Sequence, residues 1–300
     1  MPILVFGSLN IDHVYQVEHL VRPGETLPST EYRRFQGGKG ANQSVALARA
    51  GADFYLAGRI GPEGLWLRDA IAAEAVNVTH VGLGNQPTGH AIIQVDQAGE
   101  NSILLYGGAN LTVTSDDAHY VLSHFSKGDW LLLQNEISSL PAILCEASEL
   151  ELTVVFNPAP MTPEVLSFPL DGVSLFVVNQ TEGAALAQIE NASPETIVEA
   201  LQARFPDAAI LLTLGGDGSL YACGGECIRT PAHSVESVDT TAAGDTFTGY
   251  FIAERMAGGS IEKSLALASK AAALCVTRPG AAVSIPRRSE LEGTPTASEE

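Results

Sequence analysis

Short apolar runs along the chain alternate with segments in which apolar residues recur every three or four positions. The short runs end in turn-forming residues and predict strands, whereas the periodic segments predict helices. We expect strands at 3–7, 53–58, 130–134, 153–157, 175–179, 210–215 and 219–222, and helices at 39–50, 63–75, 141–147, 182–186, 195–205, 245–258 and 261–277. Buried strands separated by helices predict an α/β fold with a mainly parallel sheet covered on both faces. Ligands of such sheets bind at the carboxyl ends of the strands.

Two regions depart from this alternation. Residues 14–17 with 31–36, and 90–96 with 102–106, have the pattern of antiparallel strand pairs. They predict a small β-sheet apart from the main body, which is either a lid over a binding site or a hairpin without function. We expect one α/β domain over 1–290 and a flexible polar tail over 291–300.

Composition and charge exclude several classes of protein. A hydrophobic content of 45% and a charged content of 17% are typical of a compact soluble protein. No apolar run is long enough for a membrane span, and the N-terminus reads as a strand without a signal peptide, so we expect a cytoplasmic protein. The formal net charge of −19 opposes nucleic acid and anionic membranes. It opposes ATP as well, so a nucleotide site must rely on backbone donors and bound cations.

The cysteines and histidines do not indicate a transition-metal site. The four cysteines are scattered without paired CxxC spacing, and the seven histidines form no HxH or HExxH motif. We expect reduced, structural thiols.

The segment DTTAAGDTF at 239–247 is the strongest chemical signal. Small residues at Ala242, Ala243 and Gly244 run into an apolar helical stretch, which leaves bare backbone amides at a helix N-terminus, where anions bind. Asp245 repels a phosphate held there, but it suits a base that takes a proton from an attacking hydroxyl. The alternative is an ordinary helix start capped by aspartate.

Two earlier segments suggest a polar ligand. Asn10 and Asp12 alternate onto one side of an extended segment after the first strand, where they suit paired sugar hydroxyls or form a polar turn. The GxGxxG motif of dinucleotide folds is absent there. The segment GGKGANQ at 37–43 lacks P-loop spacing, but its glycines bring backbone close to a ligand and Asn42 offers a donor and an acceptor.

Polar residues also follow successive strands, where a parallel sheet binds its ligands. They are Gln134-Asn135-Glu136, Asn157-Pro158-Ala159-Pro160, Asn179-Gln180-Thr181-Glu182 and the glycine-rich turn at 213–218. Asn179 and Glu182 lie three positions apart at a strand-to-helix turn and are suited to a hydrated Mg²⁺ beside phosphates. Each segment alone is typical of an ordinary turn, but their joint appearance favours a shared site.

In this order the motifs resemble the carbohydrate-kinase family that contains ribokinase, fructokinase and adenosine kinase, over nearly the whole chain. The ribokinase branch is the most similar, through GSLNID, GGKGANQ, GGAN, NPAP, NQTE and VTRPGA at 7–12, 37–43, 107–110, 157–160, 179–182 and 276–281. The resemblance implies a three-layer α/β sandwich. It also implies phosphoryl transfer from ATP to the 5-hydroxyl of ribose.

The same resemblance implies roles for individual residues. A ribose site would comprise Asn10, Asp12, Gly38, Lys39, Asn42 and Glu136, with Asp245 as the base. ATP contacts would come from Asn179, Thr213, Leu214, Gly215, Gly216, Asp217, Gly218, Gly244 and the helix around Ser269. An activating K⁺ would bind side-chain oxygens of Asp239 and Ser284 and backbone carbonyls of Thr241, Cys275, Arg278 and Gly280.

Other functions remain open at this stage. A kinase for deoxyribose, fructose or a nucleoside would share these motifs, and a catalytically silent sugar- or nucleotide-binding regulator would share the fold. Retention of Asp245 argues against the regulator, because a pure binding protein needs no base. We also expect a homodimer that forms through the small sheet, and no nucleic-acid or membrane partner.

Overall fold

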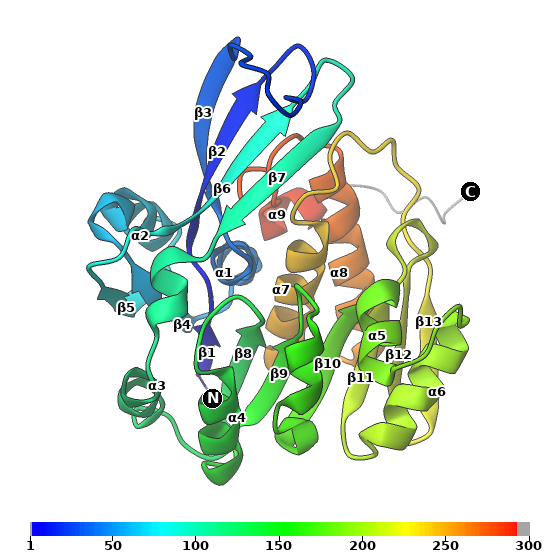
Figure 1. The fold of residues 1–300 in the computed structure, drawn as a ribbon. Coiled ribbons are helices and arrows are strands. Elements are labelled where there is room, and N and C mark those ends of the chain that lie inside the picture. The colour runs from blue at the N-terminus through cyan, green and yellow to red at the C-terminus, as the bar shows by residue number, and fades with distance from the viewer. Residues whose placement is uncertain (1, 293–300) are drawn as a thin grey trace.

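The computed structural model describes residues 2–292 and contains a large central sheet of nine strands (Figure 1). The spatial order is β13–β12–β11–β10–β9–β8–β1–β4–β5. In chain order the strands are β1 (Ile3–Phe6), β4 (Phe54–Ile60), β5 (Asn77–Leu83), β8 (Trp130–Gln134), β9 (Thr153–Asn157), β10 (Val173–Asn179), β11 (Ala209–Thr213), β12 (Ser219–Cys223) and β13 (Glu226–Thr230). Neighbours from β5 through β11 are parallel, and only the β12 and β13 pairings are antiparallel.

Helices cover both faces of this sheet and complete a three-layer α/β sandwich (Figure 1). One core lies under α3 (Ser115–Leu122), α4 (Leu140–Glu149), α5 (Gln180–Ala187) and α6 (Pro194–Arg204). The other lies under α1 (Lys39–Arg49), α2 (Leu65–Ala72), α7 (Ala243–Met256), α8 (Ile261–Val276) and α9 (Arg288–Glu292). Short 3-10 turns lie at Pro62–Gly64, Gly108–Thr112, Pro163–Ser167, Leu170–Gly172 and Gly215–Asp217. The predicted fold class is confirmed.

The small sheet expected from the sequence projects from the sandwich (Figure 1). It consists of β3 (Glu31–Gly37), β2 (Asn10–Gln16), β6 (Gly89–Val95) and β7 (Asn101–Tyr106), in that spatial order. Both antiparallel pairs are present, and a parallel β2–β6 pairing joins them. Strand β2 begins four residues earlier than expected, so Asn10 and Asp12 lie within the small sheet.

Four helices or strands were not anticipated from the sequence: β5, β13, α3 and α9. Strand β5 contains Asn, Thr and His and lies at the sheet edge, and β13 is a mostly exposed edge strand, so neither carries the apolar run of a central strand. Helix α3 is short and starts with a capping box between Thr114 and Asp117. Residues 291 and 292 of the expected flexible tail belong to α9, and Leu291 is buried. The remainder of that tail, 293–300, lies outside the described residues.

Strand register brings the polar strand ends together. Gln134 at the end of β8 pairs with Asn157 at the end of β9, and Asn179 at the end of β10 pairs with Thr213 of β11. Strand β2 begins a few residues after β1 ends, so the small sheet grows from this same edge. Within residues 2–292, no helix has the length and apolar content that crossing a membrane requires.

Candidate active site

Helix α7 begins with backbone amides that are open to an anion. Ala242 precedes it in the left-handed region, at φ +59, and provides no side-chain cap. The amide of Ala243, one of those expected to face a phosphate, donates instead to the carbonyl of Thr240 at 3.2 Å. Within residues 2–292, the amides of Gly244 and Asp245 have no hydrogen-bond acceptor. The amides that this helix end leaves open to an anion therefore include those of Gly244 and Asp245.

The carboxylate of Asp245 is buried between α7 and α1. Its Oδ2 accepts a hydrogen bond from Asn42 Nδ2 at 3.2 Å, and its Oδ1 accepts one from Gln43 Nε2 at 2.9 Å. The expected neighbour Asn42 thus contacts Asp245 directly. The adjacent Gln43 was not among the expected site residues, although it lies in the GGKGANQ segment that drew attention to Asn42.

A second group of carboxylates lies where β1, β2 and α1 meet. Glu136 accepts hydrogen bonds from the Ser8 hydroxyl and, at 2.9 Å, from the backbone amide of Lys39. The Asp12 carboxylate covers Gly37, where a Cβ atom would lie 2.2 Å from Asp12 Oδ1. Gly38 has φ +89, and a side chain there would collide with backbone of the Ser8–Asn10 segment. Glycines at 37 and 38 therefore let the backbone approach these polar groups.

Asn10 is held in place by a residue that sequence reasoning did not select. Asn110 donates to Asn10 Oδ1 at 2.7 Å, and its own Oδ1 accepts from the amide of Leu9 at 3.0 Å. Ser8, which holds Glu136, was missed in the same way. Both lie in segments used for the resemblance, GSLNID and GGAN, so the available signal was their position inside these motifs.

The charges of the site influence one another. The Asp245 carboxylate, and then those of Glu136 and Glu182, raise the pKa of Lys39, although burial of its ammonium acts in the opposite direction. Burial and the neighbouring Glu136 charge raise the pKa of Asp12 to about 7. The half-buried ammonium of Lys39 therefore lies among several carboxylates, beside the open end of α7.

Two adjoining cavities lead away from Asp245. The first, of about 320 Å³, reaches from Lys39 and Asp245 to Asn179, Glu182 and Thr213. The second, of about 460 Å³, extends to Phe247 and Ser269 and has apolar walls. They share Thr213, Gly215, Thr240 and Gly244 as lining residues. Together they form a path with a polar end at α7 and an apolar end at α8, as a phosphate chain attached to a flat base requires.

Most residues expected at the nucleotide line this path. Gly216 and Gly218 line the second cavity, and Ser269 donates to the carbonyl of Pro231 at 3.3 Å. Leu214 and Asp217 do not line it, because the Leu214 side chain packs in the core and Asp217 is exposed.

Asn179 and Glu182 face the first cavity while they also cap α5. Asn179 Oδ1 accepts from the Glu182 amide at 2.8 Å, and Glu182 Oε2 accepts from the Asn179 amide at 3.0 Å. Burial raises the pKa of Glu182, against the effect of this hydrogen bond. Its second carboxylate oxygen remains available to a hydrated cation.

The residues expected to bind K⁺ lie on the loop before α7, in the last turn of α8 at Cys275, and on the loop that follows α8. Asp239 accepts hydrogen bonds from the amides of Thr241 at 2.9 Å and Gly280 at 2.8 Å. The Cys275 thiol lies 3.1 Å from the hydroxyl of Ser284, which donates to the Ala281 carbonyl at 2.7 Å. Because the single hydroxyl proton of Ser284 goes to Ala281, the Cys275 thiol is the donor in the contact between them, and one lone pair of the Ser284 oxygen is left for a cation.

The guanidinium of Arg278, which lies on the loop after α8, is not expected to contact the ion. Arg278 forms an ion pair with Glu290 at 2.6 Å, so its guanidinium is already paired with another carboxylate. Within residues 2–292, no cluster of three or more His, Cys, Asp or Glu is suited to a transition metal.

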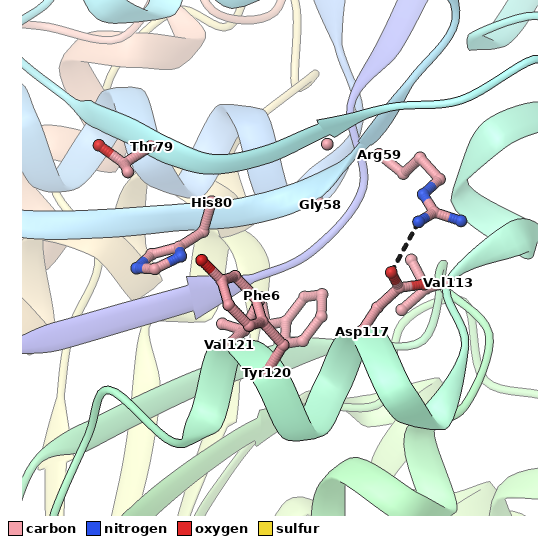
Figure 2. A pocket seen from close by; sticks show the side chains of 10 residues that line it. Phe6, Gly58, Arg59, Thr79, His80, Val113, Asp117, Tyr120 and Val121 are labelled. Atoms are coloured by element: carbon pink, nitrogen blue, oxygen red, sulfur yellow. Dashed lines mark hydrogen bonds and ion pairs between the residues drawn. The ribbon is translucent and has the colours of Figure 1, made fainter.

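A third cavity, of about 210 Å³, lies apart from this site between β4, β5 and α3 (Figure 2). Figure 2 shows Arg59 reaching to Asp117, at 2.7 Å, while His80 and Tyr120 line the opposite side. Arg59 also donates to the Thr112 carbonyl at 2.7 Å. Because these charged groups already satisfy each other and the cavity shares no lining residue with the other two, it is not part of the candidate site.

An α/β sandwich with a buried carboxylate beside open helix amides, and a polar path leading to an apolar cavity, has the construction of a phosphotransferase. Comparison with known proteins agrees with this class. Residues 2–288 match the family model described as pfkB family carbohydrate kinase. The chain belongs to this family and is a phosphotransferase with an alcohol group as acceptor.

Several relatives are similar over nearly their whole length. The chain is 36% identical over 297 residues to a ribokinase of Haemophilus influenzae, which covers 95% of each chain. A crystal structure of ribokinase from Cryptococcus neoformans in complex with ADP is 36% identical, with a TM-score of 0.82 over 97% of this chain and 98% of that one. A structure of Arabidopsis thaliana ribokinase complexed with ribose and ATP is 30% identical, with a TM-score of 0.83 over 97% of both chains.

Proposed function

We propose that the protein transfers the γ-phosphoryl group of ATP to the 5-hydroxyl of D-ribose. The observation that carries this proposal is the buried Asp245 carboxylate at the open N-terminus of α7, with polar sugar-binding groups on one side and the nucleotide path on the other. The relatives named as ribokinases support ribose over other acceptors, because this chain is 36% identical to one of them and 30% identical to another, which was solved in complex with ribose and ATP.

The sugar would bind between the small sheet and α1. Asp12, Asn10 and Glu136 supply acceptors for its secondary hydroxyls, while Asn42 supplies a further polar group beside Asp245. Asn42 Oδ1 is buried and lacks a hydrogen-bond partner among the described residues, which fits a donor brought by the substrate. Gly38 lets backbone approach the sugar ring closely.

Phosphoryl transfer depends on position and on charge stabilisation more than on covalent chemistry. The amides of Gly244 and Asp245 would hold the transferring group at the end of α7, and the Lys39 ammonium would offset its negative charge. Asp245 would accept the proton of the attacking hydroxyl. Within this proposal Ala242 and Ala243 act as small residues that keep the approach clear.

Two cations belong to the proposal. When bound, Mg²⁺ neutralises phosphate charge. Asn179 and Glu182 are the residues we propose to hold its water shell, because both line the cavity and one Glu182 oxygen is not used by the cap of α5. We propose that Asp239, Ser284 and the carbonyls of Thr241, Cys275, Arg278 and Gly280 hold a K⁺ ion. Its effect would reach the site by ordering the loop before α7.

We further propose a cytoplasmic homodimer that forms through the small sheet. Strand β7 is an edge strand, and its apolar side chains are exposed, with Ile103 58% and Leu104 69% accessible. An unpaired edge and an apolar surface are both stabilised by a second copy. Sedimentation equilibrium of Leu104→Lys against wild type tests this: a monomeric variant supports the interface, and an unchanged mass contradicts it.

The deciding experiment measures ADP release from ATP with ribose, 2-deoxyribose, fructose and adenosine. We expect the highest kcat/KM for ribose, with 2-deoxyribose about 5- to 150-fold lower because a buried polar group loses its partner. Preference for fructose or adenosine would assign the chain to another branch of the family. If the protein binds a sugar but releases no ADP from ATP with any of the four acceptors, the result would support a catalytically silent regulator.

A further inference from the structure

A chain of buried side-chain amides ends on the Asp245 carboxylate. Gln43 Nε2 donates to Asp245 Oδ1 at 2.9 Å, and Gln134 Nε2 donates to Gln43 Oε1 at 2.7 Å. Both glutamines are fully buried, and neither lines the nucleotide path. Gln134 therefore communicates with the site through Gln43 and not through a substrate.

The acceptors around these side-chain amides fix which group donates in each of their hydrogen bonds. An ionised Asp245 only accepts, so Gln43 must present Nε2 to it. Asn157 donates its Nδ2 to the carbonyl of Val177 at 2.8 Å, which turns its Oδ1 toward the same Gln43 Nε2 at 3.2 Å. Gln43 can then offer only its oxygen on the other side, so Gln134 must be a donor there.

Packing keeps the Gln134 amide in this position. A Cβ atom on Gly7 would lie 2.1 Å from Gln134 Oε1 and 2.8 Å from Gly40 Cα, so the amide is enclosed between the end of β1 and the start of α1. Gln134 Oε1 has no partner among the residues that the structure describes. A buried acceptor without a partner is unfavourable, so the hydrogen bond from Gln134 Nε2 to Gln43 is the favourable polar contact of this side chain.

We propose that Gln134 is a positioning residue for phosphoryl transfer: by donating to Gln43, it fixes the amide orientation that aims the Asp245 carboxylate at the sugar hydroxyl. This inference rests on the proposed function, because it needs Asp245 to be the base. Small displacements of a reacting group lower the rate strongly while leaving ligand contacts intact. Loss of the Gln134 donor therefore lowers kcat and leaves both KM values nearly unchanged.

Gln134→Glu tests the direction of the hydrogen bond, because it keeps the size of the side chain. The introduced carboxyl group still donates to Gln43 when it is protonated. When it is ionised, it places a negative charge against Gln43 Oε1 and favours a flipped amide. The ratio of kcat in the variant to kcat in wild type should be near one at acid pH and should fall about tenfold or more as pH rises. Taking the ratio removes the titrations that both proteins share.

Three further variants make the outcome decisive. Gln134→Met has neither donor nor charge and should lower kcat several-fold at every pH, so it decides the question if Gln134→Glu does not fold. In a Gln43→Met background, adding Gln134→Glu should cause no further pH-dependent loss. Ser44→Ala removes a buried, unpartnered hydroxyl from the same helix and should leave kcat unchanged.

The results separate this inference from the proposed function. A wild-type protein that phosphorylates no sugar contradicts the proposed function. If the wild-type protein is active, three results would overturn the inference and leave the proposed function standing. They are a kcat ratio for Gln134→Glu that does not change with pH, the same pH-dependent loss in the Gln43→Met background, and an effect of Gln134→Met on thermal stability alone.

Discussion

Gly249 of α7 lies directly against Ala46 of α1, so closely that a Cβ atom on the glycine would come within 2.5 Å of the Ala46 Cβ. One turn before this crossing, Asp245 on α7 receives hydrogen bonds from Asn42 and Gln43 on α1. The contact of two small residues thus sets the separation at which the carboxylate meets its donors. The chemistry of the site depends on helix packing as much as on the polar residues themselves.

Gly249→Ala should therefore reduce activity although alanine favours helix formation by up to about 1 kcal/mol. The added methyl group also meets the backbone of Leu47, which cannot move aside easily. We expect kcat to fall about tenfold or more, with a lower melting temperature, because α7 must shift away from α1. Gly82→Ala is the matched control, since a Cβ there meets only atoms at 3.7 Å or beyond. Equal kcat in both variants would contradict this prediction.

Asp245→Asn should abolish phosphoryl transfer while leaving sugar and ATP binding within about tenfold. The amide keeps the size of the side chain but cannot take up the hydroxyl proton. Calorimetric titration of each ligand and single-turnover kinetics separate binding from chemistry. Asp217→Asn, in the glycine-rich turn but exposed to solvent, should behave as wild type. Near-normal turnover in Asp245→Asn would show that Asp245 is not the base.

Ribose binding should weaken as pH falls through about 7. Burial and Glu136 raise the pKa of Asp12 to about 7, and in the proposed function the ionised form is the one that accepts hydrogen bonds from the sugar. Ribose Kd, measured by calorimetry without ATP, should rise by up to about tenfold per pH unit below that point. Asp12→Asn should bind more weakly at every pH and show a flat profile. A flat profile in wild type would mean that Asp12 does not titrate in the sugar site.

Protonation of Asp12 should weaken ribose binding, but it should stabilise the unliganded protein. A carboxyl whose pKa is higher in the folded state binds protons more tightly there than in the unfolded chain. Its contribution to stability is therefore present below the unfolded value of about 4 and is lost as pH rises through about 7. The melting temperature of Asp12→Asn relative to wild type should accordingly increase across this interval. A constant difference would contradict the assignment of the titration to Asp12.

The sequence predicted the α/β fold and the open N-terminus of α7 because both have local signals. Apolar runs mark the buried strands, and small residues before Asp245 mark the open helix end. The contacts that Gln134 and Asn110 make could not be assigned in this way, although Gln134 was expected near the site as a strand-end residue. Their partners lie 91 positions away at Gln43 and about 100 positions away at Leu9 and Asn10. Only the packing of α1 and of the 3-10 turn at Gly108–Thr112 against the strand ends brings these residues together.

Charge perturbation was likewise invisible in the sequence. The pKa of Asp12 depends on burial under the small sheet and on Glu136, which joins the site through a different strand end. The crossing of α1 and α7 at Gly249 is a further example. Nothing in the spacing of a lone glycine inside a helix indicates which residue it will contact.

The last prediction concerns the proposed K⁺ site. Hydrogen bonds from Thr241 and Gly280 outweigh the effect of burial and lower the pKa of Asp239, so this carboxylate stays ionised at neutral pH. The loop that it holds leads through Thr240 directly into the amides at the start of α7. An ion bound here would orient those amides without contacting substrate, and turnover should rise when K⁺ replaces a bulky organic cation at constant ionic strength, which excludes simple screening.

Two variants distinguish a bound ion from a structural effect of the loop. Ser284→Ala removes one neutral ligand but keeps the carboxylate, so it should raise the K⁺ concentration needed for half-maximal turnover several-fold and leave the plateau unchanged. Asp239→Ala removes the charge and should abolish the K⁺ response while sparing ribose binding, because no ribose contact passes through this loop. Turnover measured against K⁺ concentration checks both. Equal wild-type rates in K⁺ and in the organic cation would show that no activating ion binds between these loops.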